Sequence, residues 1–183
     1  MYAIGLFVMN AIDLEYKPSV KIMITVGLDF GTHQSKVCAE YKQGVELSYT
    51  FFTFPDTTGK HQYTLPSIIH RRPDGRMDYG YIPANSNGEI IRYFKQATFT
   101  TSSIGLKQAD AMYYSVWYLA FIIFDLEEKY GTEFTIQMGV PTDGSRLSQQ
   151  KQMAVRLLAA AYNLVENVFE NDKQAFLNKT WGE

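Results

Sequence analysis

The stretch that most constrains this chain runs from Val26 to Ser35 and reads V-G-L-D-F-G-T-H-Q-S. Apolar residues predict a buried strand at Met23–Asp29 and a second strand at Lys36–Tyr41, separated by a glycine turn. Gly31 lets the backbone turn tightly, and successive N–H groups in such a turn can hold a phosphate. Asp29 ends the strand, where its carboxylate could hold Mg²⁺ through water. The alternative is an ordinary hairpin turn in which Asp29 makes local hydrogen bonds.

The remaining turns and apolar runs predict a mixed α/β layer. A glycine turn at Lys42–Gly44 and the β-rich segment Val45–Phe54 extend the first two strands into an antiparallel meander. Further segments are predicted as strands at Tyr63–His70 and Phe134–Val140, and as helices at Leu106–Tyr130 and from Arg146 to Tyr162. Gly131 is expected to stop the long helix. The second helix is expected to bury one face, formed by Leu147, Val155, Leu158, Ala159 and Tyr162. Periodicity gives no assignment for Glu89–Phe99.

Composition narrows the class of protein. The chain has 183 residues, a net charge of -2 and a pI near 5.9, which suit one domain or one lobe and argue against a nucleic-acid binder. The single cysteine, Cys38, excludes an internal disulfide and is expected to be a small buried residue. The densest apolar run, Ala111–Phe124, is shorter than the ~20 residues a membrane span needs. We therefore expect a cytoplasmic protein with no membrane segment.

The N-terminus predicts a boundary. Residues 1–22 hold an apolar run without a basic region or a cleavage site, and Met23 stands directly before the first strand. We expect residues 1–22 to be an extension that is disordered or precedes the natural start. Residues 23–175 then form one lobe, with a small β subdomain at 44–82, and residues 176–183 form a tail or the beginning of a crossing to a second lobe.

Four segments, in the same order along the chain, resemble the actin-like ATPases, and most of all the 70-kDa heat-shock chaperones of the DnaK type. The glycine turn resembles the family's first phosphate loop. The other three segments are T-L-P-S-I-I from Thr64, followed by Asp74-Gly75; I-R-Y-F-K-Q from Ile91; and Q-M-G-V-P from Gln137. The resemblance covers residues 23–175. It implies the first lobe of an actin-like, ribonuclease-H-like ATPase domain, with a mixed sheet, packed helices and a small β subdomain.

The resemblance also implies roles for individual residues, with ATP and Mg²⁺ as cofactors. Asp29 would lie close to the metal. The β- and γ-phosphates would be held by the turn, formed by Gly31, Thr32, His33 and Gln34. Lys95 would point its ammonium at the γ-phosphate, and Asp172 would be the acid near the attacking water. Pro141 matches a proline that relays the nucleotide state to other surfaces.

Departures from the family pattern keep other functions open. His33 replaces a threonine, Asp172 replaces a glutamate, and the glycine-rich loop of the second lobe is missing. Hydrolysis would therefore need a second lobe or a partner chain, and a protein client is expected. One alternative is a non-enzymatic interaction module, and another is a lobe of a sugar-kinase-like phosphotransferase. On residue type alone, Lys95 could be a surface lysine and Asp172 a solvated helix charge. An isolated lobe is expected to self-associate.

Overall fold

The computed structural model describes residues 22–100, 105–140 and 146–180. Its main element is a five-stranded sheet with the order β10-β1-β2-β3, in which β6 also pairs with β2. These strands are β1 (Met23–Asp29), β2 (Gln34–Gln43), β3 (Glu46–Phe51), β6 (Leu65–Pro66) and β10 (Phe134–Met138). Strand β1 runs antiparallel to β2 and parallel to β10, so the sheet is mixed. The predicted α/β class is confirmed at this level.

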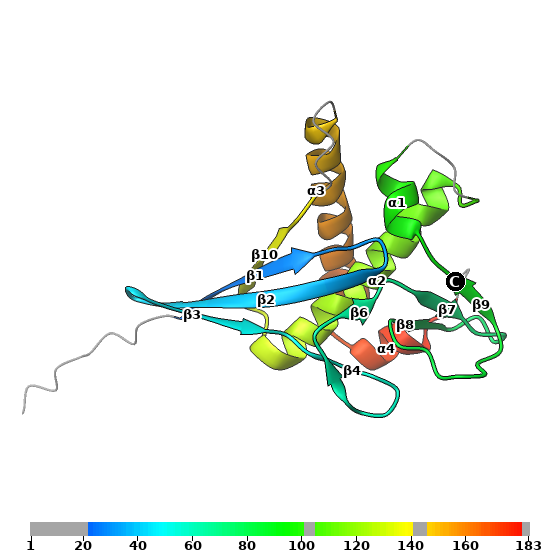
Figure 1. Cartoon of the computed structure of the whole chain (residues 1–183), viewed down its shortest axis with the longest axis horizontal. Coiled ribbons are helices and arrows are strands. Elements are labelled where there is room, and N and C mark those ends of the chain that lie inside the picture. Colours follow the sequence, from blue (N-terminus) through cyan, green and yellow to red (C-terminus); the bar gives the residue numbers. More distant parts are fainter. Residues whose placement is uncertain (1–21, 101–104, 141–145, 181–183) are drawn as a thin grey trace, which may run out of the picture.

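The predicted antiparallel meander is present. Gly44 has φ 62° in the turn between β2 and β3, a conformation that glycine adopts without steric strain. Strand β2 is longer at both ends than the predicted Lys36–Tyr41, because its first residues also pair with β6. The β2–β3 hairpin projects away from the helices (Figure 1).

Two smaller sheets follow β3. Strands β4 (Phe54–Pro55) and β5 (His61–Gln62) form one, and β8 (Met77–Tyr79), β7 (Ile69–Arg71) and β9 (Glu89–Ile91) form the other in that order. Strands β3 and β6 lie within residues 44–82 yet pair with β2 of the large sheet. The limits of a separate small subdomain therefore stay a prediction.

The long helix α2 (Gln108–Tyr130) lies at the centre of the fold (Figure 1). It is buried on most sides, as its density of apolar residues predicts. Gly131 ends it with φ 72°, which confirms the predicted stop. No helix among the described residues is long and apolar enough to cross a membrane.

The predicted inner face of the second helix is wrong. Helix α3 (Leu147–Asn163) buries Gln150, Ala154, Leu157 and Ala161, while the side chain of Val155 is 67% exposed. The buried residues are spaced by four, three and four, so the smaller alanines face α2 and permit close packing. The sequence pattern favoured the larger apolar side chains, which lie one position further round the helix.

The C-terminal elements pack against the start of the second small sheet. Helix α3 continues into a π-helical turn, η1 (Leu164–Val168), and a short helix, α4 (Lys173–Asn178), follows. Helix α1 (Phe94–Phe99) lies in the segment that the periodicity left unassigned. Phe176 of α4 is buried in a cluster of rings with centroid distances of 5.0 to 5.4 Å, formed with Tyr79, Trp117, Phe124 and Phe169.

One face of the sheet lacks a helical cover. Val37 and Ala39 of β2 are buried in the core, so Cys38 between them points to the opposite face and is only partly buried. The expectation of a buried Cys38 is therefore wrong. Three sequence predictions fall wholly or largely outside the described residues: the extension at 1–22 except for Ile22, the relay at Pro141, and the end of the tail at 181–183.

Candidate functional site

The turn between β1 and β2 requires glycine at position 31. A Cβ atom on Gly31 would lie 1.9 Å from the carbonyl oxygen of Gln34, far inside van der Waals contact. The chain therefore folds back on itself immediately after Asp29, and the exposed carboxylate of Asp29 is left at the mouth of the turn.

Ser67 holds the turn from its inner side. Its hydroxyl donates to the carbonyl oxygen of Gly31 at 2.7 Å, and its backbone N–H donates to the carbonyl oxygen of His33 at 2.9 Å. Among the described residues, no backbone acceptor meets the N–H groups of Thr32 and His33. The turn thus directs two carbonyls toward the protein body and leaves donors for an anion.

A second bracket comes from the long helix. The hydroxyl of Tyr118, which is fully buried, donates to the carbonyl oxygens of Leu65 and Pro66, each at 3.1 Å. Strand β6 is in turn paired with Gln34 and Ser35. Tyr118 therefore fixes the strand that fixes the turn.

Lys95 on α1 lies beside this turn. Its Nζ is 5.4 Å from the centre of the Phe30 ring, which lies directly between Asp29 and Gly31 in the chain. Burial lowers the pKa of the Lys95 ammonium, and the negative charge of Asp29 partly opposes that shift. The structure therefore brings Asp29, Gly31 and Lys95 into one neighbourhood.

Tyr93 also reaches the turn, from the residue that precedes α1. Its φ of 61° places it in the left-handed region, which a residue with a bulky side chain rarely adopts. Its ring meets the His33 ring edge-on, with centroids 5.6 Å apart. Both side chains are exposed, so they form a rim beside Lys95.

These groups have the chemistry of an anion site. Free N–H groups and a partly desolvated ammonium attract phosphate more strongly than the same groups in water. The remaining turn residues differ in exposure: Thr32 is partly buried and Gln34 is exposed at the start of β2. The described residues contain no cluster of three or more His, Cys, Asp or Glu side chains that could hold a metal. Asp29 is a lone carboxylate, which fits a metal bound largely by water and phosphate.

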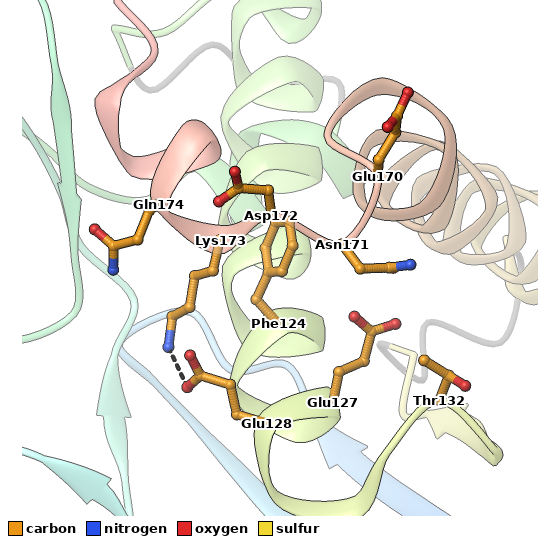
Figure 2. Close-up of a pocket in the computed structure, with 9 residues that line it drawn as sticks. All are labelled: Phe124, Glu127, Glu128, Thr132, Glu170, Asn171, Asp172, Lys173 and Gln174. Carbon is orange, nitrogen blue, oxygen red and sulfur yellow. Dashed lines mark hydrogen bonds and ion pairs between the residues drawn. The ribbon is translucent and has the colours of Figure 1, made fainter.

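Asp172 is not brought to this turn. It caps α4, where its Oδ1 accepts the N–H of Ala175 at 2.9 Å. It lines a separate pocket of about 600 Å³ with Asn171, Glu127, Glu128 and Lys173 (Figure 2).

An ion-pair network lies beside that second pocket. Lys173 Nζ donates to Asp125 Oδ1 and Glu128 Oε2, each at 2.6 Å. Burial raises the pKa of Asp125 to about 6, although Lys173 opposes the rise. Burial alone would lower the pKa of Lys173, but the two carboxylates outweigh it and the pKa is raised. The lysine and both acids are thus occupied with one another.

Sequence reasoning missed the residues that support the turn. Ser67 belonged to a recognised segment without being given a role, and its position in that segment was the available signal. The contribution of Tyr118 and the strained backbone of Tyr93 gave no local signal. The histidines not expected to bind metal have other partners: His70 Nδ1 lies 3.0 Å from Asp78 Oδ2, and His61 Nδ1 lies 3.1 Å from Thr53 Oγ1.

No family model matches the chain, and no curated protein sequence matches it.

Proposed function

We propose that this chain is the nucleotide-binding lobe of an actin-like ATPase of the DnaK type, in which the turn at residues 31–34 holds the phosphates of ATP. The observation that carries the proposal is the half-buried Lys95 ammonium beside a turn whose Thr32 and His33 N–H groups have no backbone acceptor among the described residues. The likeness of four ordered sequence segments to that family supports the choice of nucleotide.

The residues of the turn fit this ligand by shape and charge. Gly31 has no side chain, so a phosphate oxygen can approach the backbone closely. Lys95 would balance phosphate charge, and binding would remove the unfavourable effect of its burial. Asp29 would hold a water ligand of Mg²⁺, which when bound with ATP neutralises phosphate charge and activates the γ-phosphoryl group.

Hydrolysis requires groups beyond this neighbourhood. The Asp172 carboxylate caps α4 and lies against a different pocket, so we give it no part in phosphate binding. In the proposal, turnover in the cytoplasm depends on a second lobe or a partner chain, and closure of the two lobes is coupled to a protein client.

A non-enzymatic interaction module is the second candidate. The observation that favours it is the edge-on contact between His33 and Tyr93, because a ring at the rim narrows access where the family has a threonine. A sugar-kinase-like lobe has no particular observation in its favour.

The test is a titration of the 183-residue chain with Mg-ATP, followed by calorimetry and by backbone amide shifts in NMR. We expect shifts centred on residues 31–34 and loss of binding in Lys95→Met. Lys129→Met is the matched control, because Lys129 Nζ also lies over an aromatic ring, 4.8 Å from the centre of Phe52. Binding that survives Lys95→Met, or no binding at millimolar Mg-ATP, would overturn the proposal. In the second case the interaction module takes its place.

A further inference from the structure

Strand β3 is an open edge of the large sheet. It pairs with β2 on one side, and no other strand of the described residues pairs with it. The Phe52 N–H donates to the Val37 carbonyl at 2.9 Å, which fixes the alternation of the ladder. Counting back in steps of two, Thr50 and Ser48 bond to β2. The backbone N–H and C=O groups of Leu47, Tyr49 and Phe51 therefore point to the open side.

The same three residues carry large apolar side chains that are exposed to solvent. Leu47 is 53% exposed, Tyr49 65% and Phe51 62%. Their side chains share the face of the sheet on which Cys38 lies, opposite the buried Val37 and Ala39. Tyr63 extends the patch, with its ring 6.2 Å from that of Phe51. Single exposed apolar residues are ordinary, but a run of them along an open strand is a pairing surface.

The strand lacks the features that normally protect an edge. Sheet edges are usually blunted by lysine, proline or a bulge, and β3 has the sequence E-L-S-Y-T-F with one charge, at its first residue. Tyr49 is held in place from β2: a hydrogen bond from its hydroxyl to Glu40, and then the charge of Glu40, raise the pKa of Tyr49. The central ring of the patch is thus positioned before any partner arrives.

We propose that β3 pairs with the β3 strand of a second copy of this chain, antiparallel, about a two-fold axis at Tyr49. In this register Tyr49 lies opposite the partner's Tyr49, and Leu47 lies opposite the partner's Phe51. Every residue of these pairs is one whose backbone groups point outward, so all of them form inter-strand hydrogen bonds. The two sheets become one continuous sheet of two copies.

The occupant is a second copy because the strand is complementary to itself. A two-fold interface requires that each contact recur with the partners exchanged, and the apolar residues are arranged symmetrically about Tyr49. Charge agrees with this register: Glu46 falls opposite the partner's Phe52, so no like charges oppose each other across the pairing. Aromatic and aliphatic cross-strand pairs of this kind stabilise antiparallel strands.

The test is the mass of the chain in solution over a range of concentrations, by sedimentation and light scattering. We expect the mass to double with concentration in the native chain. Tyr49→Lys places two like charges at the axis, and Tyr49→Pro removes an outward N–H without disturbing the bonds to β2. Both variants are expected to stay monomeric. Val155→Lys is the matched control on α3, where Val155 is 67% exposed, and it should still dimerise.

A cross-linking series tests the register, in a Cys38→Ser background. Tyr49→Cys alone should give a disulfide-linked dimer on mild oxidation, because position 49 meets itself across the axis. Leu47→Cys alone should not, whereas Leu47→Cys combined with Phe51→Cys should. Far-UV circular dichroism confirms that each variant folds. A native chain that stays monomeric at every concentration, or a dimer that persists in Tyr49→Lys and Tyr49→Pro, would overturn the proposal.

Discussion

Two half-buried lysines, Lys95 on α1 and Lys173 on α4, differ in what surrounds them. Lys173 has two carboxylates at 2.6 Å, and its pKa is raised although burial alone would lower it. Lys95 has the Phe30 ring and the more distant charge of Asp29, and burial lowers its pKa. Equal residue type and similar burial therefore give opposite shifts.

The difference separates a structural lysine from one available to a ligand. The ion pairs of Lys173 offset its desolvation inside the protein, so an incoming anion would gain little from it. Lys95 keeps an unfavourable desolvation that an anion would relieve, which is a property of functional sites. The comparison predicts that changes around Lys173 act on stability, and changes around Lys95 act on binding.

Phe176→Ala should have the largest effect. Phe176 is 1% exposed and contacts four rings, so its loss should lower the free energy of unfolding by about 3–5 kcal/mol. Urea denaturation measures the change, with Val168→Ala, at an exposed position of η1, as the control. Loss of Mg-ATP binding by the folded fraction of Phe176→Ala would break the comparison, since this region should not serve the turn.

Lys173→Met should come next, with an effect that depends on pH. The pKa of folded Asp125, about 6, lies above the ordinary 3.8, so its contribution to stability is present below about pH 4 and is lost as the pH rises through 6. Removing Lys173 leaves this buried carboxylate unpaired. We expect a loss of about 3 kcal/mol at pH 8 and a smaller loss at pH 5, where Asp125 can hold a proton. Denaturation at the two pH values measures this, and the exposed Lys151→Met should show no such dependence.

Gly31→Ala tests the shape of the turn. The added Cβ would collide with the Gln34 carbonyl, and relieving the clash should lower the free energy of unfolding by about 2 kcal/mol. Thermal unfolding and amide shifts of residues 29–35 measure it. Gly27→Ala is the control, since its Cβ would meet the Cys38 carbonyl oxygen at an ordinary 3.7 Å. Equal effects of the two variants would contradict a sterically required glycine.

Lys95→Met should have the smallest effect on stability and the sharpest on binding. Removing a partly desolvated charge is expected to raise the free energy of unfolding by about 0.5 kcal/mol. Phosphate affinity should fall at the same time. In the native chain, affinity should also fall toward alkaline pH, earlier than for an ordinary lysine, because the Lys95 pKa is lowered. A destabilised Lys95→Met variant would assign Lys95 a structural role like that of Lys173.

The sequence predicted the secondary structure best where local signals were strong. The strand at Met23–Asp29, the meander, and the end of α2 at Gly131 follow from apolar periodicity and glycine turns. The inner face of α3 was predicted wrongly, because apolar size suggested Val155 while close packing against α2 selected smaller residues. Cys38 was misjudged for a related reason: period-two alternation within β2 decides its face, and the neighbouring apolar residues do not.

The candidate site shows the same division. The sequence by itself determined a tight glycine turn after an aspartate, since only glycine fits a backbone that folds back so closely. Tertiary structure alone decided that Lys95 lies beside this turn and that Asp172 caps α4 elsewhere. It also decided that Ser67 and Tyr118 hold the turn and that β3 has an open edge. The physical reason is that turns and caps depend on a few adjacent residues, whereas the neighbours of a side chain across the fold depend on how whole elements pack.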